Sequence, residues 1–144
     1  MRNVLAITED SEISAVNNVI HDCLFEKDKI TFDSKSSLLE INFNYESQEQ
    51  KRILKRILFL KKIGVPIYKY ILRIANVENY HIHEDTQKSP GTDDYFNVIV
   101  YDPQENMVKI KTIIAKGIDV KVSKLKLFIE DSCEKVGEKI YFRL

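Results

Sequence analysis

Two histidines and an aspartate stand at alternate positions near the middle of the sequence. His81, His83 and Asp85 are each separated by one residue, and in a β-strand such positions place their side chains on one face. Imidazole and carboxylate groups are ligands of zinc and iron, so the spacing indicates a candidate metal site. The solvated face of an edge strand shows the same alternation. We favour the solvated face and expect no bound metal or cofactor.

A second group of reactive residue types is contiguous. His21, Asp22 and Cys23 bring together an imidazole, a carboxylate and a thiol, the groups used in thiol catalysis. In a strand, however, Asp22 would point away from both neighbours, and Cys23 would join the apolar row of Phe25. Buried cysteine usually behaves as a small apolar side chain. We therefore expect a structural role for these three residues and no catalytic residue among them.

Basic residues are concentrated in one stretch of the chain. Residues 51–73 contain eight Lys or Arg and no acidic residue, whereas residues 78–106 contain seven acidic residues and one basic one. A basic helix here would be typical of a surface that contacts a membrane or RNA, but no aromatic side chains interleave with the charges. The acidic stretch could also neutralise them, which favours a solvated face. The candidates for an interaction surface are Lys51, Arg52, Lys55, Arg56, Tyr80, Asp93 and Asp94.

The composition is that of an ordinary globular domain. Zero net charge, from 22 basic and 22 acidic side chains, gives no preference for nucleic acid or an anionic membrane. No stretch is apolar for long enough to cross a membrane, and acidic residues between positions 9 and 12 interrupt any signal peptide. The two cysteines are expected to be free thiols in a reducing compartment. We therefore expect one cytoplasmic domain, residues 1–144, with neither a membrane nor a nucleic acid as its partner.

Alternating apolar and polar residues predict strands over most of the chain. A short helix is expected after Asp10 or Ser11. Its apolar face would consist of Ile13, Val16, Val19 and Ile20. The predicted strands are 23–25, 30–32, 39–45, 68–74, 80–84, 95–101, 107–113, one long bulged strand over 118–129, and 140–144, and residues 3–8 fit either a short strand or a tail. The fold class is mainly β (α+β), an antiparallel meander that forms a β-sandwich or a partly open barrel.

Residues 47–63 allow two predictions. Ser47 and Gln50 have the spacing of a capping box, and the apolar residues between 53 and 58 lie on one helical stripe. These features favour a helix for the first half. Ile57, Phe59 and Ile63 also fit one face of a strand, which favours a strand for part of the second half.

Three short runs carry a family resemblance. His21–Phe25, Ile30–Asp33 and Leu39–Phe43 together resemble small bacterial β-rich domains of unknown function, in which a His-Asp pair opens the first long strand and a hairpin follows. Some of those domains look like immunity proteins, which bind and neutralise a toxin. The resemblance implies a bacterial binding domain, and it carries over no catalytic residue.

Together these features indicate a non-enzymatic binding module that presents a sheet face or edge to a protein partner. The reasons are the lack of a convergent catalytic set, the uneven charge and the tyrosine-rich middle of the chain, since tyrosine is favoured at interfaces. The competing hypothesis is a metal-binding protein or metal-dependent enzyme that uses His81, His83 and Asp85. A third hypothesis is RNA or membrane-surface association through residues 51–62. The oligomeric state is open.

Overall fold

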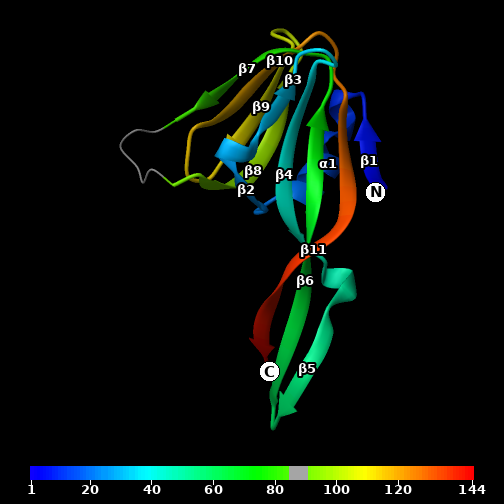
Figure 1. Ribbon diagram of the computed structural model, residues 1–144, viewed down its shortest axis with the longest axis vertical. Helices are drawn as coiled ribbons and strands as arrows, with labels where there is room; N and C mark the ends of the chain where they lie inside the picture. Colours follow the sequence, from blue (N-terminus) through cyan, green and yellow to red (C-terminus); the bar gives the residue numbers. More distant parts are fainter. Residues whose placement is uncertain (85–90) are drawn as a thin grey trace.

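All strands belong to one open, antiparallel sheet, in the order β1-β11-β6-β4-β2-β8-β9-β10-β7, with β3 paired to β4 and β5 paired to β6. The computed structural model describes residues 1–84 and 91–144 (Figure 1). The elements are β1 (Arg2–Ile7), η1 (Asp10–Glu12), α1 (Ile13–Ile20), β2 (Leu24–Glu26), η2 (Lys27–Lys29), β3 (Thr31–Asp33), β4 (Leu38–Glu46), η3 (Gln48–Gln50), β5 (Arg52–Ile57), β6 (Leu60–Ile74), β7 (Val77–His83), β8 (Asp93–Asp102), β9 (Met107–Thr112), β10 (Gly117–Val122) and β11 (Leu127–Arg143). The prediction of a mainly antiparallel β fold is confirmed.

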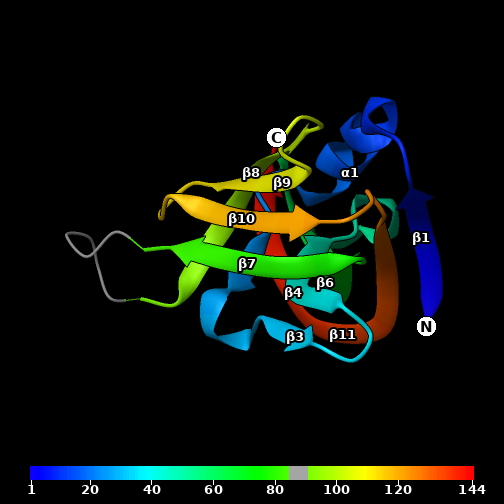
Figure 2. The ribbon, with the colours of Figure 1, turned by 90° about the horizontal axis from the view of Figure 1, so that it is seen from above.

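The sheet curls so that its two halves enclose one core (Figure 2). Alternate residues of β4 and β6 point inward, because a strand turns successive side chains to opposite faces. They meet the inward side chains of β8, β9 and β10. Phe43 packs edge to face on Phe96, with 5.6 Å between the ring centroids. At the open side, Phe32 of β3 contacts Tyr80 of β7 at 5.5 Å between ring centroids. The result fits the expected partly open barrel.

Helix α1 covers one end of the core. Ile13, Val16 and Ile20 are buried, as the spacing predicts. Asn17 fixes the helix to β8, because its side chain donates to the carbonyl of Ile99 and accepts from the same residue's N–H. The helix is therefore confirmed.

The start of this helical segment differs from the expected cap at Asp10 or Ser11. A 3-10 turn already begins at Asp10. The carboxylate of Glu12 accepts hydrogen bonds from the N–H groups of Thr8 and Glu9, so the side chain that satisfies the free N–H groups lies inside the turn.

The helix expected in the first half of residues 47–63 is wrong. Only the 3-10 turn η3 follows Ser47, and Arg52–Ile57 is strand β5, which forms a hairpin with β6 across Leu58 and Phe59. Apolar residues at 53, 54, 57 and 58 fit a helical stripe, but the residues of β5 are all exposed. Hydrogen-bonded pairing with β6 makes this segment a strand, although its own pattern of apolar residues fits a helix.

The single bulged strand expected over 118–129 is also wrong. β10 ends at Val122 and pairs with β7 and β9, whereas β11 begins at Leu127 and pairs with β1 and β6. The phase change between these strands marks a crossing from one half of the sheet to the other. The expected short strand at 140–144 is the far end of β11, which continues through Gly137 to Arg143.

β6 and β11 are long enough to leave the body of the protein. Beyond the curled sheet they run side by side, and with β5 they form a three-stranded arm that ends at the turn between β5 and β6 (Figure 1). We define the arm as β5, its turn, residues 60–66 of β6 and residues 137–143 of β11. None of its residues belongs to the core cluster of the body.

Among the described residues, no helix has the length and apolar character needed to cross a membrane.

Candidate interaction surface

The arm is a single layer of three strands with apolar side chains that no other element covers. Residues opposite one another in an antiparallel ladder project from the same face. Five apolar side chains lie on the face that carries Gly64: the register places Ile57, Leu60, Ile140 and Phe142 there, and Leu54 in the bulge of β5 lies against Gly64 itself. Their exposed fractions range from 38% at Leu54 and Leu60 to 63% at Phe142. We call this set the apolar face.

The apolar character continues over the end of the arm. Leu58 and Phe59 form the turn and are 95% and 86% exposed, the highest values for large apolar residues inside the chain. Together with Ile57 and Leu60 they make four consecutive apolar residues, which we call the tip. Large apolar groups that cluster on a surface mark a contact site more often than single exposed ones do.

A group of cations lies directly behind the tip. The register pairs Lys55 with Lys62 and Arg56 with Lys61, and Lys61 also pairs with Arg143 on the other side. We call these five residues the collar. Within residues 1–84 and 91–144, the collar side chains make no ion pair. The outer part of the arm therefore carries positive charge that these residues leave uncompensated. Like charges directly opposite one another in a ladder are also unfavourable.

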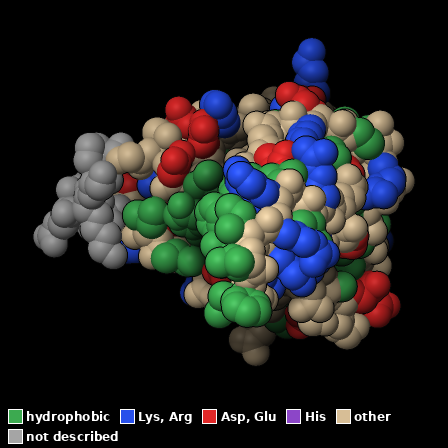
Figure 3. Space-filling model, turned by 90° about the horizontal axis from the view of Figure 1, so that it is seen from below, with side chains coloured by type: hydrophobic (Ala, Val, Ile, Leu, Met, Phe, Trp, Pro, Cys, Tyr) green, Lys and Arg blue, Asp and Glu red, His purple; other side chains and the backbone are tan. Residues whose placement is uncertain are grey.

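Figure 3 views the molecule from below, the side on which the arm projects. Hydrophobic side chains gather there in one patch beside a group of Lys and Arg side chains.

The base of the arm contains ion pairs, although Oε1 of Glu138 is buried there without a hydrogen-bond partner among the described residues. Glu138 lies over Gly64 and pairs with Arg52 at 3.5 Å and with Lys135 at 3.4 Å. A Cβ at position 64 would meet the end of the Glu138 side chain, which would have to turn aside. On the opposite face, Tyr141 donates a hydrogen bond to Glu46. The unbalanced charge is thus confined to the outer part of the arm.

The other sequence-predicted surface residues lie elsewhere. Lys51 is exposed at the start of β5, and Asp93 is exposed at the start of β8. Tyr80 is half-buried against Phe32. Asp94 has no exposed surface at all, so the prediction that it belongs to an interaction surface is wrong. Among the described residues of the acidic stretch, none forms an ion pair with the arm, and Asp102 pairs with Lys109 of β9 at 3.8 Å.

The two histidines of the metal hypothesis share one face of β7. Their ring centroids are 4.5 Å apart, and Nε2 of His83 lies 2.8 Å from Asp119 of β10. Asp85, the third proposed ligand, lies outside the described residues. Within the described ranges, no group of three or more His, Cys, Asp or Glu side chains has the geometry of a metal site.

His21, Asp22 and Cys23 line one side of an open cavity of about 620 Å³ between α1, β2 and the end of β4. His21 contacts the carbonyl of Asn97 at 2.9 Å and Asp22 at 3.4 Å. The Cys23 thiol donates to the carbonyl of Val19, and burial, with a smaller effect of the Glu46 and Asp22 charges, raises its pKa to about 12. A thiol held in its protonated form is a poor nucleophile.

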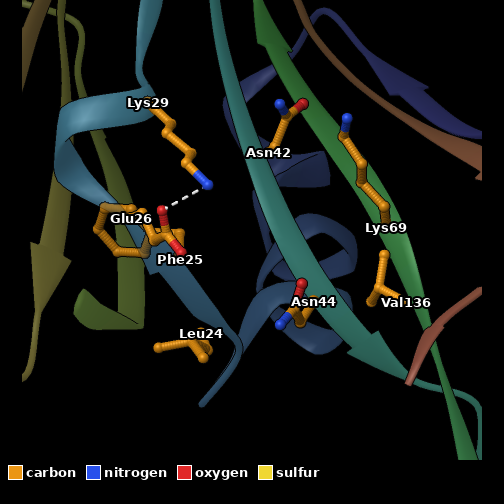
Figure 4. A pocket seen from close by; sticks show the side chains of 8 residues that line it. All are labelled: Leu24, Phe25, Glu26, Lys29, Asn42, Asn44, Lys69 and Val136. Atoms are coloured by element: carbon orange, nitrogen blue, oxygen red, sulfur yellow. Dashed lines mark ion pairs between the residues drawn. The ribbon is translucent and has the colours of Figure 1, made fainter. Parts of the chain in front are cut away.

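A smaller cavity of about 200 Å³ lies between β2, β4 and β6 (Figure 4). Its polar lining includes Lys29, Asn42, Asn44 and Lys69. Figure 4 shows Lys29 turned toward Glu26, with which it pairs at 2.8 Å. Lys69 lies 3.9 Å from Glu134. Both ammonium groups are therefore compensated from within the chain, unlike those of the collar.

The sequence predicts only part of the arm as an interaction surface. The basic residues of β5 were among the candidates, but Ile140, Phe142 and Arg143 of β11 were not, because they are about 80 residues away in the chain. The register brings Phe142 opposite Lys62, so an aromatic side chain does stand among the cations. A signal was present in the four consecutive apolar residues of the tip, which lie between two basic pairs.

The comparisons with known proteins return no relative. No protein-family model matches the chain, and neither a curated protein nor a solved structure is significantly similar to it.

Proposed function

We propose that the protein is a non-enzymatic binding module and that the arm is its contact surface. One observation carries the proposal: the arm combines an uncovered apolar face and tip with five cations that lack ion-pair partners among the described residues. A partner that supplies both apolar cover and negative charge would satisfy both sets of groups at once.

The energetics favour this reading over a purely structural role. Covering a Leu, Ile or Phe side chain is worth about 1.5–3 kcal/mol relative to full exposure, and the partly exposed side chains of the arm leave a share of this free energy unused. The cations opposite one another in the ladder weaken the arm further. An arm that served only the stability of the chain would be more stable with polar side chains on its exposed face and with opposite charges facing each other across the ladder.

The groups considered for catalysis support the same proposal. The thiol of Cys23 is half-buried and its pKa is raised to about 12, and Nε2 of His83 is paired with Asp119. The protein partner, the bacterial source and the cytoplasmic location expected from the sequence are compatible with a binding role and remain proposals.

Fractionation at native expression levels tests the proposal. In cells that naturally make the protein, a tagged chain should leave the 16.8 kDa monomer fraction, either with the membrane pellet or in a larger soluble complex. Lys55→Glu with Arg56→Glu should return it to the monomer fraction, because the change reverses the charge of the β5 part of the collar. Low salt is used throughout, since screening weakens exposed charge interactions.

The matched control is Lys124→Glu with Lys126→Glu, which makes the same change of net charge at two exposed positions of the body. This variant should behave like the unchanged chain. If the unchanged chain is itself a monomer in the soluble fraction, or if the control is displaced as strongly as the arm variant, the arm is not a specific contact surface.

A further inference from the structure

We infer that the arm docks on an anionic phospholipid surface, with its tip among the acyl chains and its collar at the headgroup phosphates. The inference rests on the proposed function, since it names the partner of the same arm. It departs from the expectation, based on zero net charge, that no membrane is bound. The net charge is zero, but the charge is segregated, and the arm carries the positive part.

The first argument is the order of chemistry along the arm. Four apolar residues form the outermost end, the collar cations follow, and the body comes after them. A bilayer surface presents the complementary order, with acyl chains inside and phosphates outside them. Peripheral proteins that lie in this interface bury apolar side chains to a depth of about 5–10 Å while basic side chains stay at the headgroups. The tip and collar are adjacent, as this depth requires.

The second argument is the turn itself. Leu58 has a φ of 50°, a left-handed conformation that is costly for a branched side chain and that hairpin turns normally give to Gly or Asn. Leu58 and Phe59 project into solvent there and pack on nothing in the core cluster. Neither side chain therefore serves the stability of the hairpin, and contact outside the chain is the remaining use for both.

The third argument compares other occupants. A second copy docked arm to arm would oppose two collars of the same charge. Strand addition to the free edge of β5 meets a bulge between Ile53 and Lys55 and a row of cations, which are devices that block edge pairing. RNA would neutralise the collar but would leave four aliphatic or aromatic tip residues in water. An anionic bilayer satisfies the tip and the collar together.

The absence of tryptophan from the sequence permits a direct experiment. Phe59→Trp places one indole at the tip, and Val100→Trp places one at an exposed position of β8 in the body. Each full-length variant is mixed with vesicles of phosphatidylcholine, alone or containing phosphatidylglycerol. With phosphatidylglycerol present, we expect both variants to sediment with the vesicles, because both keep the tip and the collar, but only Phe59→Trp to show a blue shift of emission. Binding should be at least about tenfold weaker without the anionic lipid and should fall with added salt.

Charge and apolar variants in the Phe59→Trp chain separate the two contributions. Lys55→Glu with Arg56→Glu should abolish binding, whereas Lys124→Glu with Lys126→Glu should leave it unchanged. Leu58→Ser should weaken binding while the far-ultraviolet circular dichroism spectrum stays the same. The spectra also show that each variant is folded.

Several outcomes would overturn the inference. These are no vesicle binding at low salt, binding without a blue shift at position 59, equal binding to neutral vesicles, or preferential binding of single-stranded RNA at the same salt concentration. If vesicles are not bound but the arm variant still returns the chain to the monomer fraction in cells, the partner of the arm is not a lipid surface and the proposed function stands. If both experiments fail, both proposals fall.

Discussion

Asp94 shows how one buried carboxylate can hold two segments together. It lies at the start of β8 and accepts hydrogen bonds from the backbone N–H groups of Tyr95, Ile114 and Ala115. Burial alone would raise the pKa of this carboxyl, but the three backbone N–H groups and the Thr112 hydroxyl favour the charged form, so the pKa is lowered overall. The charge therefore fastens the segment after β9 to β8.

Replacing this carboxylate should destabilise the protein in a pH-dependent way. Asp94→Asn leaves one acceptor oxygen and points an amide donor at backbone N–H groups, which should cost about 1–3 kcal/mol at neutral pH. Because the folded pKa is depressed, the stabilisation is present above the unfolded value of about 3.9 and is lost as the pH falls through the folded value. Urea unfolding at several pH values measures the difference. A difference that stays constant from neutral pH into the acid range would contradict this account.

The two cysteines should differ sharply in reactivity. Burial keeps Cys23 protonated with a pKa of about 12, whereas Cys133 is exposed. An aromatic disulfide reagent should therefore modify one thiol in the native chain and both in guanidinium. The variant Cys133→Ser should show no rapid reaction until it is unfolded. Rapid native labelling of that variant would show that Cys23 is more accessible than its surroundings imply.

At the scale of elements, strands with one buried face could be predicted and strands without one could not. β4 alternates because Leu39, Ile41 and Phe43 enter the core while their neighbours face outward. β5 has no buried face, so its sequence carries no period of two. Its strand conformation depends on a ladder with β6 that no local window of sequence contains.

β11 illustrates the same limit. The polar residues between 130 and 139 conceal a strand that is interrupted by register shifts near Lys135 and by a positive φ of 63° at Cys133. β6 supplies ladder partners on both sides of this irregular stretch, up to Asp131 and again from Gly137, so the strand resumes despite its composition. The β5 part of the candidate site could be predicted from charge, but the part on β11 depends on this pairing.

The arm and the body should respond very differently to the loss of apolar groups. Leu72→Ala, at a position of β6 with no exposed surface, should cost about 2–5 kcal/mol by leaving a cavity in the core. Phe59→Ala removes a larger side chain, but since that side chain is 86% exposed, the free energy of unfolding should change by less than about 0.5 kcal/mol. Denaturant unfolding of the two variants makes the comparison. A large loss for Phe59→Ala would mean that the tip is packed against the chain.

At the scale of the whole molecule, the core cluster lies in the body, although Val65 and Pro66 at the base of the arm are also buried. The last residue of the core cluster in sequence is Ile129. Residues 137–144 contribute contacts such as those of Lys139 and Tyr141 with Glu46 at the base of the arm. The body is thus complete without the outer part of β11.

Truncation after Val136 should therefore leave a folded body. We expect one cooperative thermal transition at a lower temperature, because the truncation removes the ladder from Gly137 to Arg143 and the hydrogen bond from Tyr141 to Glu46 but no residue of the core cluster. Near-ultraviolet circular dichroism should be retained. Truncation after Lys126 removes all of β11, including Leu127 and Ile129 of the core, and should abolish the transition. If the shorter truncation also unfolds the chain, body and arm form one cooperative unit.

The continuity of β6 and β11 has a mechanical consequence. Their ladder extends from the pair Leu127–Ile74 in the body to the pair Arg143–Lys61 near the end of the arm. A pull on the end of the arm acts along this ladder, so its hydrogen bonds are loaded in shear and share the force instead of breaking one after another. Tension applied there would reach the middle of the sheet, and the arm would act as a tether under load.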